Sequence, residues 1–219
     1  MYDLSSVVDF DALAEVRPGS SILVSGPAMT GKQQLAYDIL ADGAASGDGA
    51  VVVTTSDKAS DVVEEFRDRV PELKGSQLGV VDCRGEGGAD PELIEGVSVH
   101  QVSSPGDLTG IGIGITKALE SLHNSGLERG RLALISLSTM LTYTDKKTVF
   151  KFCHVLSSRL DAAGYVGVFT IDSSAHDQQT IQVIKQAFDG LIDIRDAEGG
   201  GREARVLGLA TEPTDWKRI

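Results

Sequence analysis

The residues best suited to chemistry form the loop Gly26-Pro27-Ala28-Met29-Thr30-Gly31-Lys32-Gln33. Two glycines bound a short turn that ends in a lysine, which is the spacing of a loop that holds phosphate with its backbone N–H groups. Lys32 would then reach the outer phosphates as a positive charge. The pattern ordinarily ends in Lys-Ser or Lys-Thr, because that hydroxyl binds Mg²⁺, and here Gln33 takes its place. The loop therefore predicts nucleotide binding with an altered metal site.

The elements on either side of this loop are those that phosphate binding requires. The apolar run 21–25 predicts a strand directly before the loop, and the pattern from residue 34 to about residue 45 predicts a helix directly after it. The N-terminus of such a helix adds partial positive charge to the N–H groups of the turn. A chance glycine turn is disfavoured by this context.

Strands and helices alternate along the rest of the chain. Strands are predicted at 50–55, 78–83, 97–102, 132–137 and 166–171, and helices at 57–70, 108–123, 145–163 and 180–188. The glycines at 110, 112 and 114 leave an extended start to the second of these helices as an alternative, and the glycine-rich segment 84–90 predicts a loop. Segments 191–195 and 204–210 flank three consecutive glycines and predict an antiparallel hairpin.

This alternation predicts an α/β fold with a mainly parallel central sheet, helices on both faces and a C-terminal antiparallel hairpin. We expect one domain over residues 1–219, with a lead-in at 1–19, the hairpin at 191–210 and a tail at 211–219.

The composition limits the environment and the partners. The net charge is −12, with 32 acidic and 20 basic residues, a profile that resembles proteins of salt-adapted cytoplasms. In ordinary salt this charge disfavours nonspecific DNA binding. We expect a cytoplasmic protein without membrane insertion, because no signal peptide and no membrane-length apolar run is evident. The two isolated cysteines predict buried free thiols.

Four segments in a fixed order carry a family resemblance: the loop 26–33 and the segments 53–57, 132–138 and 188–194. Together they resemble a single domain of the RecA superfamily, in the KaiC-like branch that includes the archaellum ATPase FlaH and small RadA relatives. The resemblance covers essentially the whole chain. It implies a RecA-like P-loop fold, makes 26–33 the Walker A loop, and implies ATP with Mg²⁺ as the ligand.

The same resemblance implies that most of the family's catalytic groups are replaced. Alignment puts Ile135 where the family has its metal-binding aspartate, and no acidic residue occurs from 132 to 143. The glutamate that activates water is replaced by Ser56, followed by Asp57. Asp57 is the one catalytic candidate, although its position favours a cap for the next helix. Because phosphoryl transfer depends on charge neutralisation and positioning, we predict weak or absent hydrolysis and assign no metal ligand.

Other candidates lie further along the chain. His176 follows a strand whose loop approaches the γ-phosphate in this fold, so it is a sensor candidate; the alternative is a surface loop with Asp177 as a helix cap. Arg202 and Arg205 could reach a neighbour's phosphates or simply lie on a solvated hairpin. Trp216 either tucks the tail onto the body or anchors a partner.

Four functions remain open at this point. The leading hypothesis is an ATP-binding regulator or assembly factor with an unidentified protein partner or self-association. The second is a slow ATPase. The third, a RadA-related DNA-binding protein, is disfavoured because no basic DNA loop is evident and the lead-in offers only Phe10 as an exposed filament anchor. The fourth, a scaffold without nucleotide, is disfavoured by the retention of Lys32.

Overall fold

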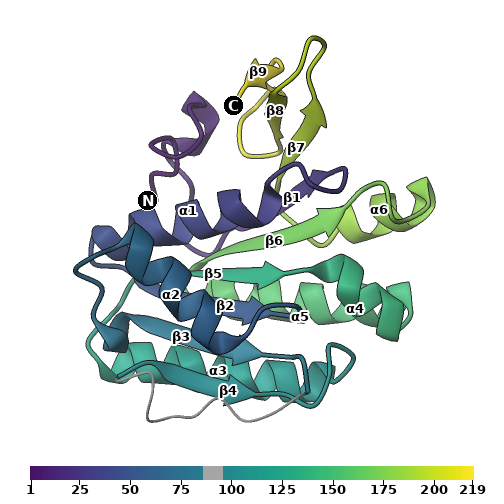
Figure 1. Ribbon diagram of the computed structural model, residues 1–219. Coiled ribbons are helices and arrows are strands. Elements are labelled where there is room, and N and C mark those ends of the chain that lie inside the picture. Colours follow the sequence, from purple (N-terminus) through teal and green to yellow (C-terminus); the bar gives the residue numbers. More distant parts are fainter. Residues whose placement is uncertain (86–95) are drawn as a thin grey trace.

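A computed structural model describes residues 1–85 and 96–219 and shows one nine-stranded sheet with helices on both faces (Figure 1). The predicted loop at 84–90 lies outside the described residues from residue 86 onward. The strands are β1 (Ser21–Gly26), β2 (Gly49–Thr54), β3 (Leu78–Asp82), β4 (Ser98–Gln101), β5 (Gly130–Ile135), β6 (Val166–Asp172), β7 (Gly190–Asp196), β8 (Arg202–Leu207) and β9 (Lys217–Arg218). The helices are α1 (Lys32–Ala45), α2 (Ala59–Arg69), α3 (Leu108–Asn124), α4 (Leu137–Tyr143), α5 (Lys146–Ala163) and α6 (Gln178–Lys185), with short 3₁₀ turns at Asp11–Leu13 and Gly75–Gln77.

The sheet has the strand order β4-β3-β2-β5-β6-β1-β7-β8-β9. The seven strands from β4 to β7 pair in parallel, and β8 and β9 are antiparallel. Every residue of β1, β2, β3 and β5 is buried, as expected for strands covered on both faces. The predicted α/β fold class, with its parallel sheet and C-terminal hairpin, is confirmed.

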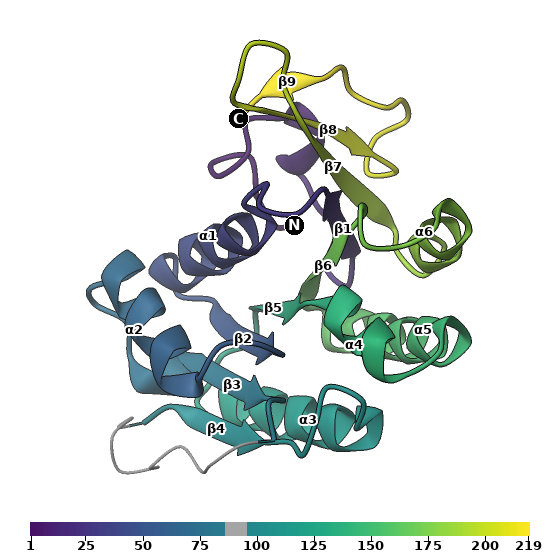
Figure 2. The same cartoon turned by 45° about the vertical axis from the view of Figure 1, so that its right-hand side comes forward.

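Two hydrophobic cores lie on opposite faces of the sheet. Helices α1 and α2 cover one face, and α3, α4, α5 and α6 cover the other (Figure 2). The first core also takes in the lead-in, where Phe10 is only 6% exposed. The prediction that Phe10 is an exposed anchor is therefore wrong, because this ring packs in the core beneath the hairpin end of the sheet. None of the described helices is both long enough and apolar enough to cross a membrane.

The structure corrects one predicted boundary, the end of β5, and decides between two alternatives at another, the start of α3. Strand β5 ends at Ile135, and the unpredicted helix α4 follows because Ser136 Oγ accepts a hydrogen bond of 3.1 Å from the Ser138 N–H. Helix α3 is helical from Leu108 onward, so its start is not extended. Its first turn is held by Asp107, whose Oδ1 accepts from the Gly110 N–H at 2.8 Å.

Candidate functional site

Four loops meet at one edge of the sheet, because the carboxyl ends of parallel strands lie together. They follow β1 (residues 27–31), β2 (55–58), β5 (136) and β6 (173–177). Strand β6 lies directly between β1 and β5. Open α/β sheets bind their ligands at this edge. The fold therefore brings the predicted Walker A loop, Asp57, Ile135 and His176 to the same edge.

Each of the two glycines that bound the predicted Walker A loop has a steric reason to be glycine. A Cβ atom on Gly26 would lie 2.9 Å from both the Ile194 carbonyl oxygen and Thr30 Oγ1. Gly31, the N-cap of α1, has a φ of 75°, in the left-handed region that side chains disfavour. The loop thus packs tightly against β7 and turns sharply into α1.

Positive groups gather where this loop meets α1. The backbone N–H groups of Gly31, Lys32 and Gln33 donate to no other group within the described residues, as is usual in the first turn of a helix. The half-buried ammonium of Lys32 donates to the Pro27 carbonyl oxygen. Burial lowers the pKa of Lys32, an effect opposed by the nearby charge of Asp172. These groups can hold an anion, which fits a nucleotide phosphate.

Gln33 and Asp57 contact each other directly. Gln33 Nε2 donates to Asp57 Oδ2, and the Tyr37 hydroxyl donates to the same oxygen at 3.3 Å. Burial and the Asp57 carboxylate raise the pKa of Tyr37, so this hydroxyl keeps its proton. Gln33, at the position expected for a metal-binding hydroxyl, is therefore hydrogen-bonded to Asp57, the one catalytic candidate of the sequence.

Asp57 does not cap α2, so that prediction is wrong. The N-cap is Lys58, whose side chain makes no capping bond. Instead, Asp82 at the end of β3 accepts from the Ala59 N–H at 3.3 Å. The acceptor for the first turn of α2 thus comes from the neighbouring strand β3 and not from the loop that precedes the helix. The Asp57 side chain instead contacts Gln33 and Tyr37 of α1.

Strand β5 brings no carboxylate to the site. Ile135 lies at its carboxyl end and is 2% exposed. The next residue, Ser136, donates its N–H to Thr55 Oγ1 at 3.1 Å, which ties this strand end to the loop after β2. Across residues 1–85 and 96–219, no cluster of three or more histidine, cysteine, aspartate or glutamate residues could hold a metal ion.

Asp172 is a site residue that the sequence reasoning missed. It ends β6, directly beside Gly26 in the parallel register. Its Oδ1 accepts from the Ser174 N–H at 2.9 Å and from the Ser174 hydroxyl at 2.7 Å. Burial raises its pKa, but the Ser174 hydrogen bonds and the charge of Lys32 outweigh this and lower it overall. The signal was present in the sequence, since Asp172 is the acidic residue that directly follows a buried strand.

His176 lies in the same loop, and its contact is with Ser138 of α4 rather than with Lys32. Its Nε2 is 2.9 Å from Ser138 Oγ, which also accepts from the Asp172 N–H at 2.9 Å. The next residue, Asp177, caps α6 by accepting from the Thr180 N–H, as the alternative interpretation of this loop expects. The Ser138 hydroxyl thus links the His176 ring to the backbone of Asp172.

Arg202 of the hairpin reaches the loop between β1 and α1 of its own chain. Its Nη1 donates to the Thr30 carbonyl oxygen at 2.7 Å. The same nitrogen lies 1.9 Å from where a Cβ atom on Gly31 would stand, so a side chain there would displace the guanidinium. A second cation therefore lies beside Lys32 without any neighbouring subunit.

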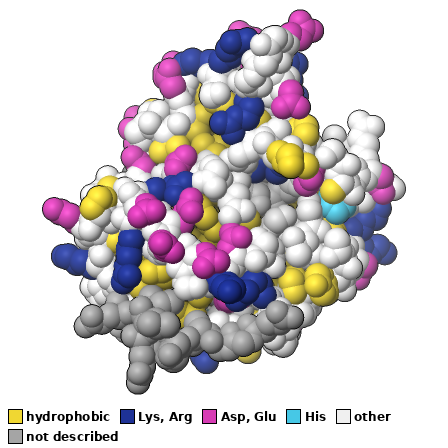
Figure 3. All heavy atoms as spheres, viewed as in Figure 1, with side chains coloured by type: hydrophobic (Ala, Val, Ile, Leu, Met, Phe, Trp, Pro, Cys, Tyr) yellow, Lys and Arg dark blue, Asp and Glu magenta, His cyan; other side chains and the backbone are white. Residues whose placement is uncertain are grey.

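The rest of the hairpin is held by charge and stacking. Arg205 pairs with Asp193 at 3.0 Å. Trp216 lies near two guanidinium groups, with the Arg195 and Arg205 carbons 4.0 and 4.5 Å from its ring centroid. The tail thus folds back onto the hairpin. Figure 3 shows acidic and basic side chains mixed over the face that α1 and α2 cover. The positive groups of the candidate site therefore belong to a protein whose net charge is −12.

Comparison with known proteins places the chain in a family and supports its fold. Residues 19–194 match the model of a family of unknown function, DUF7504. Among solved structures, the chain is similar to a KaiC-like protein from the hyperthermophilic archaeon Pyrococcus horikoshii OT3, with a TM-score of 0.63 and 15% identity over 98% of this chain and 87% of that one. A search of curated proteins gave no match. The chain therefore belongs to DUF7504, a family of unknown function, and has a KaiC-like RecA fold.

Proposed function

We propose that this chain binds ATP without a strict need for Mg²⁺ and acts as a nucleotide-dependent regulator or assembly factor with weak or no hydrolysis. One observation carries the proposal: Lys32 and the N–H groups of the first turn of α1 lie at a glycine-bounded loop between β1 and α1. The KaiC-like fold supports it, because this loop lies at the edge where such sheets bind ligands.

Replacement of the metal-binding groups supports binding without efficient chemistry. Gln33 is engaged with Asp57, and the carboxyl end of β5 carries the apolar Ile135. Charge neutralisation in phosphoryl transfer normally needs the metal. In this chain Lys32 and Arg202 supply positive charge from the protein itself. Such a site can neutralise bound phosphates but lacks the groups that position water and a cation.

A non-hydrolysed nucleotide would work as a structural ligand. Arg202 connects the Walker A loop to β8, and β8 pairs with β7 and β9. A phosphate that draws Arg202 away from the Thr30 carbonyl would shift the hairpin relative to the loop. The nucleotide thereby stabilises one hairpin position, which a protein partner or a second copy can recognise.

A slow ATPase is the second candidate, and Asp172 is the observation that favours it. Mg²⁺ is commonly held by one or two carboxylates together with substrate phosphates. Asp172 is close enough to Lys32 to influence its pKa, and Asp57 lies at the same sheet edge. These two carboxylates could together replace the one missing from β5.

Calorimetric titration of ATP with Mg²⁺ and then with EDTA tests the proposal. We expect saturable binding of similar strength in both, loss of binding in Lys32→Ala, and no phosphate release. Lys147→Ala is the matched control, because it removes an exposed lysine on α5 and should leave binding unchanged. Binding at a hundredfold excess over Kd should also stabilise the protein by about 2.7 kcal/mol.

The other outcomes separate the alternatives. Binding that requires Mg²⁺, with phosphate release that Asp172→Asn abolishes, would replace the proposal with the slow ATPase. No binding in either buffer, from protein that melts cooperatively, would refute nucleotide binding and leave the scaffold hypothesis.

A further inference from the structure

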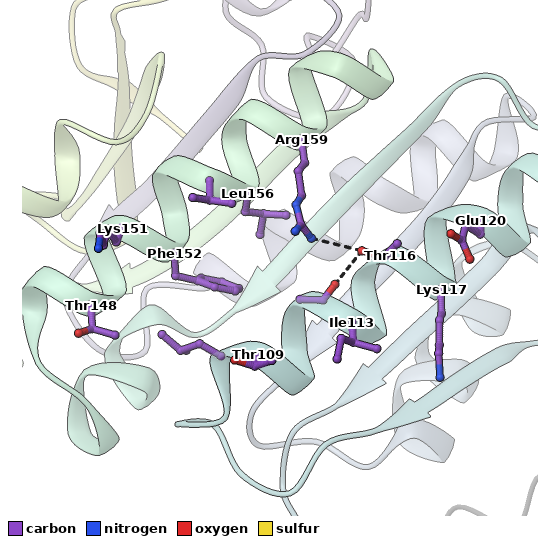
Figure 4. A pocket seen from close by; sticks show the side chains of 13 residues that line it. Thr109, Ile113, Thr116, Lys117, Glu120, Thr148, Lys151, Phe152, Leu156 and Arg159 are labelled. Atoms are coloured by element: carbon purple, nitrogen blue, oxygen red, sulfur yellow. Dashed lines mark hydrogen bonds between the residues drawn. The ribbon is translucent and has the colours of Figure 1, made fainter.

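An apolar groove lies between α3 and α5, on the face of the sheet opposite α1 and α2. It encloses about 760 Å³. Figure 4 shows Phe152 and Leu156 on the α5 side and Ile113 on the α3 side. Ile113 is 53% exposed and Val155, also in the lining, is 51% exposed. Large apolar side chains left this open on neighbouring helices mark an interaction surface.

Small residues on α3 keep the groove open. A Cβ atom on Gly112 would find only the Arg159 guanidinium within 4 Å, at 3.9 Å. Arg159 crosses from α5 and donates to Thr116 Oγ1 at 3.3 Å, as Figure 4 shows. A second hollow of about 880 Å³ begins there and shares Thr116, Glu120 and Arg159 with the first. The two hollows together follow much of α3, whose 17 residues span about 25 Å.

The charge lining the first hollow is opposite to that of the whole protein, whereas the second hollow carries Glu120 and Glu128 beside Arg159. Lys117, Lys151 and Arg159 line the first hollow, against a single acidic residue, Glu120. None of these three cations forms an ion pair among the described residues. Three unpaired cations beside apolar side chains are unexpected in a chain with a net charge of −12. An occupant with carboxylates would complement them.

We propose that this groove binds an acidic amphipathic helix of a partner protein. Apolar side chains of that helix, at i, i+3 or i+4 and i+7, pack on Ile113, Phe152 and Val155. Glutamates or aspartates beside that stripe meet Lys117 and Lys151. The open length along α3 matches a helix of several turns.

A second copy of this chain does not offer such a helix among the described residues. Helix α2 is its acidic helix, with Asp61, Glu64, Glu65 and Asp68, yet Val62, Val63 and Phe66 are buried in the first core. Its apolar stripe is therefore already used. The fitting occupant is a different protein.

Fluorescence anisotropy with synthetic peptides tests the proposal on the full chain. The probe is a labelled helical peptide of about 18 residues with leucines at the groove spacing and glutamates beside them. The comparison peptide carries lysines in place of the glutamates. We expect the glutamate peptide to bind at least tenfold more tightly, and Ile113→Ser with Val155→Ser to weaken it about tenfold.

Charge reversal makes the test specific. In Lys117→Glu with Lys151→Glu, the preference should reverse toward the lysine peptide. Tyr143→Ser is the matched control, because Tyr143 is 60% exposed and does not line the groove. Circular dichroism melts verify that each variant folds, which is expected since the changed side chains are exposed.

Three results would overturn the proposal. Equal binding of both peptides would show that the cations do not select the occupant. Binding unaffected by the groove variants but weakened by Tyr143→Ser would place the surface elsewhere. Self-association that Ile113→Ser and Val155→Ser abolish, measured by light scattering, would make a second copy the occupant.

Discussion

Replacement of Arg202 by alanine tests whether the protein itself supplies charge to the nucleotide. The substitution removes the guanidinium that donates to the Thr30 carbonyl oxygen and lies against Gly31. It leaves the loop glycines and Lys32 in place. If Arg202 moves from the carbonyl to a phosphate, its loss should weaken ATP binding most when no Mg²⁺ is present.

The structure sets the size of this effect. A hydrogen bond to a charged group contributes about 1.5–3 kcal/mol, and about 1.4 kcal/mol corresponds to tenfold in Kd. Arg202 is half-buried, so solvent screens it and the lower end of that range applies. We therefore expect Kd to rise about tenfold in EDTA at ~0.1 M KCl, and by less at ~1 M KCl, where the Debye length is about 3 Å.

Calorimetry and tryptophan fluorescence provide independent measurements. Trp216, the single tryptophan, lies in the tail that packs on this hairpin, close to the guanidinium groups of Arg195 and Arg205. ATP should change its emission in the wild type and less so in Arg202→Ala. Arg218→Ala is the control, since it removes an exposed arginine from the neighbouring strand β9.

Two results would refute this reasoning. If Arg202→Ala binds ATP in EDTA as tightly as the wild type, the guanidinium only braces the loop. If Arg218→Ala weakens binding equally, the effect comes from net charge and not from the contact with Thr30.

Three further predictions concern stability and reactivity. Arg131, 3% exposed, pairs with Asp48 at 3.4 Å; Arg131→Ala should destabilise the fold by about 3 kcal/mol in urea titrations, and an unchanged midpoint would contradict a structural role for this pair. Burial raises the pKa of both cysteine thiols to about 12. In the folded protein at about pH 8, roughly one thiol in ten thousand is therefore ionised. A thiol reagent should label these cysteines only after denaturation, and labelling of the folded protein would contradict their burial. Hydrogen bonds from the first turn of α6 lower the pKa of Asp177 below the ordinary aspartate value of 3.8. The stability they confer is complete above that value and is lost as pH falls through the lowered pKa. The difference in Tm between Asp177→Asn and the wild type should therefore shrink as pH falls below 3.8, and a difference that stays constant would argue against this linkage.

Local patterns predicted most of the fold. The glycine and lysine spacing of 26–33 identified the loop because the preceding strand and following helix have strong patterns of their own. Asp145 and Asp177 were readable as helix starts because capping depends on residues two or three positions away. Helix α4 was missed because it has only seven residues and begins one residue after β5, so its first residue fell within the predicted strand 132–137.

Contacts between distant segments were beyond the sequence. The bond between Gln33 and Asp57 joins residues 24 apart, and that between Arg202 and Thr30 joins residues 172 apart. Both depend on the order of strands in the sheet, which local periodicity does not encode. For the same reason the importance of Asp172 emerged only once β6 was seen to lie beside β1.

Within the part of the chain that the structure describes, the two outermost strands of the sheet limit how copies of this chain can assemble. On one side lies β4, of four residues, and on the other β9, of two, which pairs only with Glu203 and Ala204 of β8. Unpaired peptide groups along an outermost strand are templates for adding further strands, and very short outermost strands restrict that addition. Growth of a continuous intermolecular sheet is therefore disfavoured, and assemblies that include this chain are expected to form through helix faces and loops.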